Sequence, residues 1–197
     1  QSNTLSITGG TEDLSYFMSV AHDRNTGIIR DIHGFERMNA RLNVTYQAKD
    51  WLEVKTNFSI TSTKSDEPRD RNNVQNPFRA MYDYNPYETK YQVDDDNNIL
   101  YDEFGKPLWN LTANGYSISE AIVNNPEDEF TTTILGGINA KATIAKGLTN
   151  TLQLGATNIR FRRENFLKPN SVLQGYVGDA DNPGAKTDNG SMSLSYV

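Results

Sequence analysis

The feature of this sequence that most constrains its fold is a strict alternation of apolar and polar residues. Between residues 37 and 48 every second side chain is apolar, namely Met38, Ala40, Leu42, Val44 and Tyr46. Successive side chains of a β-strand point to opposite faces, whereas a helix repeats every 3.6 residues. The alternation therefore predicts a strand with one apolar and one polar face.

The same alternation recurs along the chain and predicts further strands. The expected ranges are 3–9, 14–22, 35–48, 51–63, 131–145, 148–163 and 190–197. Tight connections near residues 9–13, 49–50 and 145–147 take turns with long ones at about 23–34, 64–130 and 164–190. Alternate connections of an antiparallel meander lie at the same end of the sheet. We therefore expect an all-β, antiparallel up-and-down meander that has short turns at one end and long loops at the other.

The polar faces of these strands are too charged for a dry interior and must meet water. Their charged members are Arg37, Arg41, Glu53, Lys55 and Lys141. The apolar faces then cover either a second sheet or lipid. A membrane-crossing β-strand needs only about 9–11 residues with every second one apolar, and outer-membrane barrels have short periplasmic turns and long outer loops. This pattern favours an arc of a large transmembrane β-barrel, with an ordinary β-sandwich as the alternative.

Composition and charge narrow the class of protein further. Only 36% of the residues are hydrophobic, yet 10% are aromatic, which is high for a disordered chain. The net charge of -6 argues against nucleic-acid binding, which needs clustered Lys and Arg. Most of the acidic excess lies between residues 66 and 129, within the longest loop.

Several short segments, taken in order, resemble a known family of transporters. They are Gly9–Glu12 (GGTE), Ser15–Phe17 (SYF), Gly27–Ile29 (GII), Phe35–Asn43 (FERMNARLN) and Lys146–Gly155 (KGLTNTLQLG). Their order and spacing are similar to those of the barrel in SusC/RagA-type TonB-linked outer-membrane proteins. The resemblance covers most of residues 3–63 and 130–160.

The resemblance implies a barrel of 22 strands with an N-terminal plug. It also implies a multi-pass location in the bacterial outer membrane, a TonB partner, and a SusD-like surface lipoprotein that acts as a lid during import of oligosaccharides or peptides. On this basis we expect residues 1–197 to be an internal section of the barrel without the plug. Contacts with TonB and the lipoprotein would then involve parts outside this sequence.

The loop predicted at 64–130 contains the candidate ligand-binding residues. They are the aromatic residues Tyr82, Tyr84, Tyr87, Tyr91 and Trp109. Aromatic rings on an outer loop can stack on the apolar C–H faces of sugars. The same rings could instead pack the loop against itself or against a lid protein, because a folded loop also needs a core.

Neither a cofactor nor an enzymatic activity is expected. The segment Asp94–Asn98 offers oxygen ligands for Ca²⁺ but lacks the Gly and distal Glu of an EF-hand loop, and it predicts a hairpin with residues 95–98 at its tip. The chain has no Cys and only two His, so neither a zinc site nor a Cys nucleophile is supported.

Two alternative functions remain open at this point. One is a secreted, soluble β-sandwich that binds carbohydrate through the long loop. The other is a siderophore-type TonB-dependent receptor or a porin, which would share the barrel but differ in its plug and loops.

Overall fold

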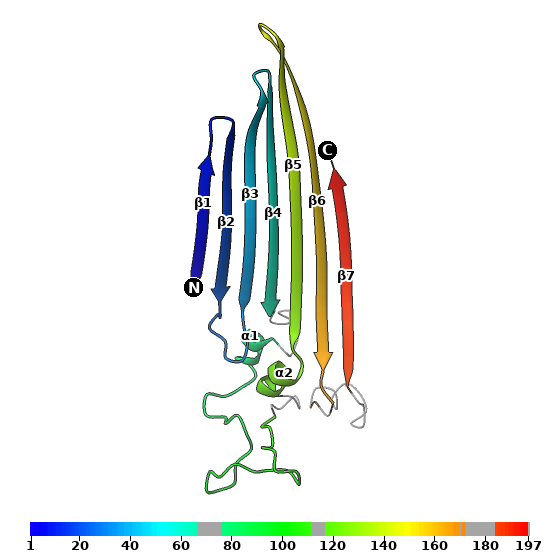
Figure 1. Ribbon diagram of the computed structural model, residues 1–197. Coiled ribbons are helices and arrows are strands. Elements are labelled where there is room, and N and C mark those ends of the chain that lie inside the picture. Colours follow the sequence, from blue (N-terminus) through cyan, green and yellow to red (C-terminus); the bar gives the residue numbers. More distant parts are fainter. Residues whose placement is uncertain (67–75, 112–116, 170, 172–183, 197) are drawn as a thin grey trace.

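The computed structural model describes residues 1–66, 76–111, 117–169, 171 and 184–196 (Figure 1). Its seven strands form one sheet in the order β1 to β7, and each strand is antiparallel to the next. The strands are β1 (Ser2–Gly10), β2 (Leu14–Asn25), β3 (Phe35–Lys49), β4 (Leu52–Asp66), β5 (Glu127–Ala145), β6 (Leu148–Leu167) and β7 (Ala185–Tyr196). The sheet confirms the predicted all-β up-and-down meander.

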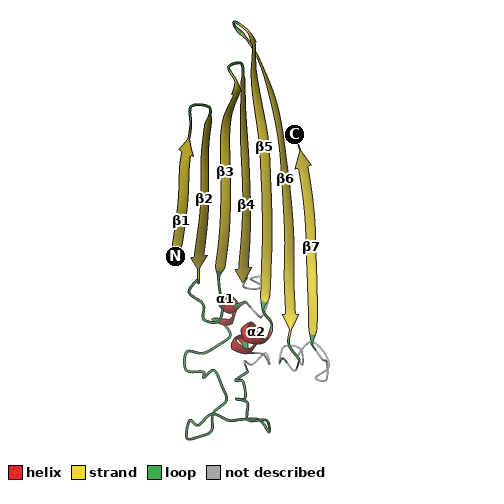
Figure 2. Ribbon diagram, in the orientation of Figure 1, coloured by secondary structure: helices red, strands yellow, loops and turns green. Residues whose placement is uncertain are grey.

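The connections are sorted by length between the two ends of the sheet, as the sequence predicts. Short turns join β1 to β2, β3 to β4 and β5 to β6 at the upper end in Figure 1. The longer connections lie at the lower end, together with two short helices, α1 (Pro77–Ala80) and α2 (Ile118–Asn124). Figure 2 shows that helix is confined to this end and that the strands form a single layer.

Cross-strand neighbours lie on the same face, so the register defines two chemically different faces. A row on the first, which we call the apolar face, contains Leu5, Val20, Ala40, Ile60 and Ile134. A row on the second, the polar face, contains Ser15, Thr45, Lys55, Asn139 and Gln153. The register therefore brings together the alternating residues that the sequence pattern separates.

Neither face of the sheet is covered by another part of the described chain. The described residues that are buried all lie at the end with the long connections, and they are Asn76, Ser117, Glu120, Ala121, Asn125 and Ser171. On the apolar face, by contrast, Ile138 is 49% exposed and Leu152 is 56% exposed. Burial of apolar area is the main driving force of folding, so this face needs an apolar environment from outside the described residues.

The observed strands are longer than the predicted ranges, chiefly at the end with the long connections. There β2 continues to Asn25, β4 to Asp66 and β6 to Leu167, while β5 already begins at Glu127. Most residues at this end are polar or charged on both faces, so the regular apolar alternation that marks a strand is lost. Cross-strand ion pairs such as Arg163 with Glu129 join the strands there instead.

Two glycines with nearly the same backbone conformation give a test of the fold. Gly34, before β3, has φ +78°, and a Cβ there would lie 2.1 Å from the backbone oxygen of Asn25. Gly147, in the β5–β6 turn, has φ +80° with nothing within 4 Å of a Cβ. We expect Gly147→Ala to cost about 1–2 kcal/mol from the left-handed conformation alone. Gly34→Ala should cost more, about 3 kcal/mol, because the backbone must also move.

Urea unfolding of the intact protein in detergent would compare the two variants with wild type. Equal losses of stability in the two variants would contradict the close contact between Gly34 and the backbone of Asn25 in β2.

Candidate functional site

A hollow of about 420 Å³ lies over the middle of β5 and β6 and extends to β3, β4 and the end of β7, and most of its lining side chains come from the polar face. Gly137 and Gly155 face each other across β5 and β6, so the hollow reaches the backbone there. A Cβ on Gly137 would lie 2.5 Å from Oδ1 of Asn57. The Asn57 amide therefore lies directly over Gly137, where a larger side chain would displace it.

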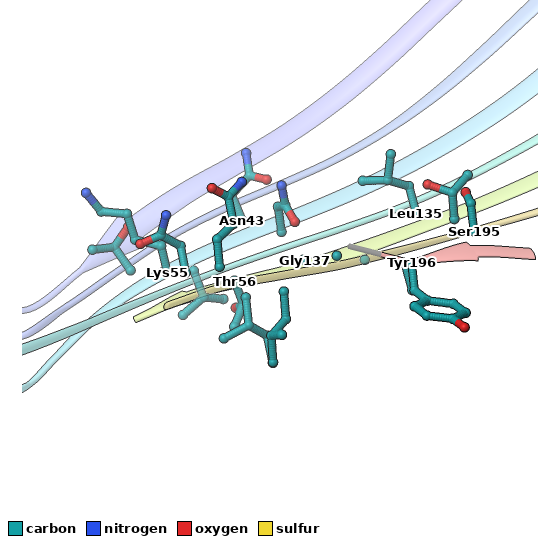
Figure 3. A pocket seen from close by; sticks show the side chains of 18 residues that line it. Asn43, Lys55, Thr56, Leu135, Gly137, Ser195 and Tyr196 are labelled. Atoms are coloured by element: carbon teal, nitrogen blue, oxygen red, sulfur yellow. The ribbon is translucent and has the colours of Figure 1, made fainter. Parts of the chain in front are cut away.

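The rim of the hollow is rich in groups that form hydrogen bonds. Side-chain amides come from Asn43, Asn57, Asn139 and Gln153, and Lys55 supplies a cation. Figure 3 shows Asn43, Leu135 and Ser195 on one side of the sheet and the Tyr196 ring on the other. Amides both donate and accept hydrogen bonds, so they suit peptide groups and sugar hydroxyls alike. Sequence analysis missed this site because it depends on which strands pair.

Two of the five predicted aromatic residues lie together. The rings of Tyr91 and Trp109 are 4.9 Å apart between centroids, with an angle of 44° between their planes. The ammonium of Lys90 lies 5.5 Å from the Tyr91 ring and 5.4 Å from the Trp109 ring, which favours a cation–π interaction. These residues form a small folded unit within the long connection.

The other predicted aromatic residues have different environments. Tyr82 is 90% exposed and Tyr87 is 82% exposed, so both rings are available to a partner or ligand. The hydroxyl oxygen of Tyr84 accepts a hydrogen bond of 3.0 Å from the backbone N–H of Ile118, at the start of α2. The structure therefore gives Tyr84 a role within the loop and leaves the contacts of Tyr82 and Tyr87 as a prediction.

The acidic segment that was considered for Ca²⁺ forms a hairpin turn, as the sequence predicts. Asp94 Oδ1 accepts hydrogen bonds from the N–H groups of Asp96 and Asn98, at 3.0 and 2.8 Å. Val93 and Ile99 pair across this turn. Asp102 repeats the arrangement eight residues later, with bonds from the N–H groups of residues 104 and 106. The part of the chain that the structure describes contains no group of three acidic or histidine side chains placed to hold a metal ion.

Hydrogen bonds join the connection between β4 and β5 to the chain that leaves β6. Lys168 donates through Nζ to the carbonyl oxygen of Val123 at 2.8 Å, and the Asn125 amide donates to Ser171 Oγ at 3.1 Å.

Helix α2 begins after its N-cap, Ser117, whose side chain accepts a hydrogen bond from the backbone N–H of Glu120. The sequence Ser-Ile-Ser-Glu has the spacing of a capping box. That motif could have predicted the start of α2.

Comparisons with known proteins give one informative result. No protein-family model matches the sequence, and no curated protein matches it either. A solved structure of the RagAB peptide importer in its "open-open" state superposes with a TM-score of 0.72 at 20% identity. The match covers 99% of this chain. This chain has the fold of one section of that importer.

The match supports the resemblance to SusC/RagA transporters noted from the sequence, and at 20% identity it establishes the fold alone. This chain spans only 20% of the length of the matched importer chain. None of the helices among the described residues is long and apolar enough to cross a membrane.

The turn at Asp94 gives a first test of the loop. We expect Asp94→Ala to loosen the hairpin, because the N–H groups of Asp96 and Asn98 lose their acceptor. Asp95→Ala is the matched control, since Asp95 makes no hydrogen bond with a described residue. Faster amide hydrogen exchange over residues 91–109 in the first variant alone is the expected result. Equal exchange in both variants would contradict this role.

The stability of the same turn should depend on pH. Hydrogen bonds from the backbone and side chain of Asn98 lower the pKa of Asp94 below its ordinary value of 3.8. Because the pKa is lowered in the folded turn, ionised Asp94 stabilises the turn at pH values above its ordinary pKa. This stabilisation is lost as the pH falls through the lowered pKa. Order in the turn should therefore persist at pH 4 to 7 and decrease only below about 3.8. Loss of order in the turn already near neutral pH would contradict this role of the Asp94 carboxylate.

Tyr84 gives a second test. Tyr84→Phe removes the acceptor for the Ile118 N–H and should destabilise the docking of α2 by about 0.5–1.5 kcal/mol. Tyr87→Phe is the control because that side chain is 82% exposed. Hydrogen exchange of residues 117–125 should accelerate only in the first variant, and no difference between the two would show that the bond does not hold α2.

Proposed function

We propose that this chain forms part of the wall of an outer-membrane, TonB-dependent importer of oligosaccharides or peptides. In this proposal its role is transport and not catalysis. The importer would work with a SusD-like surface lipoprotein and receive energy from TonB, and both contacts would involve parts beyond these residues. The substrate would enter from the end with the long connections.

The observation that carries the proposal is the uncovered apolar face of the sheet. On β5 the apolar face runs from Ile134 through Ile138 and Ala140 to Ala142, and Ile144 follows at the irregularity before the turn. Ten residue steps span about 33 Å along a strand, and a tilt of about 40° reduces this to about 25 Å across a membrane. That height matches the apolar band of outer-membrane barrels, which is about 25 Å.

The sorted connections support an orientation. Short turns at one end and long connections at the other are typical of barrels whose turns face the periplasm. The end with α1, α2 and the aromatic pair Tyr91–Trp109 would then lie outside the cell. A lid lipoprotein could contact the exposed rings of Tyr82 and Tyr87 there.

The polar face would line the lumen of the barrel in this proposal. Its amide-rimmed hollow around Gly137 offers hydrogen bonds to peptide groups or sugar hydroxyls, or to a protein segment within the lumen. The matched structure is described as a peptide importer, which favours peptides as the first substrates to test.

The alternatives are less well supported by the arrangement of the strands. A soluble sandwich needs a second sheet packed on the apolar face, whereas all seven described strands belong to one sheet. A siderophore receptor or a porin would have the same wall. We prefer the nutrient importer because the matched structure has that activity.

Neighbouring residues on opposite faces of β5 test the proposal. Ile138 lies near the middle of the apolar face and Asn139 lies on the polar face. Arg at the membrane midplane costs about 2–4 kcal/mol on a lipid-facing position. We expect Ile138→Arg to lose that much stability in lipid vesicles and Asn139→Arg to lose far less, because its side chain would meet water.

Urea titration of the intact protein folded into vesicles, read by the shift of folded barrel on a gel, measures both variants. If Asn139→Arg were as costly as Ile138→Arg, or if neither variant lost stability, the proposed membrane contact would be wrong.

A further inference from the structure

A cluster of cations lies on the apolar face where the apolar band ends. We define the cation cluster as Lys64 on β4 with Arg160 and Arg162 on β6, arranged around Phe130 on β5. All four side chains belong to the apolar face, because the register places Lys64 and Arg162 opposite Phe130, and Arg160 lies two residues from Arg162. Three cations are thus grouped on this face beyond the end of its apolar band.

The position of the cluster along the strands matches the headgroup layer of a membrane. The last apolar pair across β4 and β5 is Ile60 with Ile134. Arg160 pairs with residue 132, about 5 Å further out for a strand tilted by about 40°, and Phe130 lies about 10 Å out. Each headgroup layer is about 5–8 Å thick, so Arg160 lies within it, while the long side chains of Lys64 and Arg162 can extend back to it from about 2–5 Å beyond.

Phe130 holds two of these cations in place. The Lys64 ammonium lies 5.5 Å from the ring centroid, and the Arg162 guanidinium carbon lies 4.8 Å from it. Both distances allow a cation–π interaction. The ring at the edge of the apolar band therefore positions a cation from β4 and another from β6 on either side of β5.

The charges of the cluster remain available to a ligand. Arg160 forms no salt bridge with a described residue. Lys64 pairs with Asp128 at 3.3 Å and Arg162 with Glu164 at 2.7 Å, but these basic side chains are 47% and 56% exposed. Exposed pairs of this kind contribute little, about 0–1 kcal/mol, so a stronger anion can compete for the cations.

On β4 to β6 the acidic residues of the apolar face lie further out than the cations, while Glu36 on β3 lies beside Lys64 in the same row. Asp66 and Asp128 pair with each other one row beyond Lys64 and Phe130, and Glu164 pairs with Asp128 on the other side. Between β4 and β6 the inner two rows of the apolar face contain Ser62, Thr132 and Phe130 besides the cations, and no carboxylate. On β4 to β6 the order from the membrane outward is therefore apolar, cationic and acidic, which is complementary to a layer of phosphates just outside the hydrocarbon.

We propose that the cation cluster binds phosphate groups of anionic lipid headgroups in the leaflet on the side of the long connections. This inference rests on the proposed membrane location of the apolar face, and it adds a lipid-binding site to the importer. Arg160 and Arg162 would contact phosphate oxygens directly, with Lys64 completing the site across Phe130.

The test uses the intact protein in nanodiscs that contain equal amounts of phosphatidylglycerol and phosphatidylcholine. Native mass spectrometry then counts each lipid retained by the protein. One cation near an anionic surface contributes about fivefold to binding, so Arg160→Gln with Arg162→Gln should reduce the preference for phosphatidylglycerol about 25-fold. The matched control removes two cations from the polar face, Arg41→Gln with Lys141→Gln, and should keep the preference.

A second variant tests whether the positive charge at residues 160 and 162, and not an effect of the substitutions on folding, is responsible for the preference. Arg160→Lys with Arg162→Lys keeps both charges and should keep most of the preference for phosphatidylglycerol. No preference in the wild-type protein, or equal losses in the Gln variant and its polar-face control, would overturn the site. Failure of the wild-type protein to enter nanodiscs would instead contradict the proposed function itself.

Discussion

The continuous antiparallel ladder from β1 to β7 is the interaction on which the rest of this structure depends. It satisfies the backbone N–H and C=O groups of the inner strands within the sheet, so either face can meet a medium that offers no hydrogen bonds. Side chains then decide what each face meets, and here one face is apolar and the other polar. A sheet of this kind has no core of its own, which is why the buried residues lie only among the described long connections.

The strands also change character along their length. The apolar band between Ile134 and Ile144 on β5 is followed by the basic residues around Phe130 and then by carboxylates such as Asp128 and Glu164. This order resembles the layers of a membrane surface, from hydrocarbon to headgroups to water. The sorting of the connections is an independent feature, and in the proposed orientation it assigns the same end of the sheet to the outside.

Much of the fold could be predicted from the sequence because strand faces depend on local alternation. Residues 37–48 alternate without exception, so β3 and its neighbours were predictable. The ends of β2, β4 and β6 were not, since those ends are held by charged pairs and lack an apolar face. Long-range pairing is also invisible to alternation, which explains why the hollow at Gly137 and Gly155 emerged only from the register.

The candidate loop residues were less predictable for a similar reason. An aromatic residue in a polar loop can bind a ligand or pack the loop, and sequence does not separate the two. Tyr84 serves the loop through its bond to the Ile118 N–H, Tyr91 and Trp109 pack on each other, and Tyr82 remains exposed. Only the contacts distinguish these roles.

A spin-label scan of β5 from residue 134 to 142, before the irregularity at 143–145, tests the central claim most directly. Each position would carry a nitroxide on an introduced cysteine in the intact protein in vesicles, since the described section has no native cysteine. The account predicts that even-numbered positions are relaxed by oxygen dissolved in lipid and odd-numbered positions by a water-soluble nickel chelate, in strict alternation. Relaxation by nickel at every position, or protection of the even positions from both agents, would contradict a lipid-facing wall.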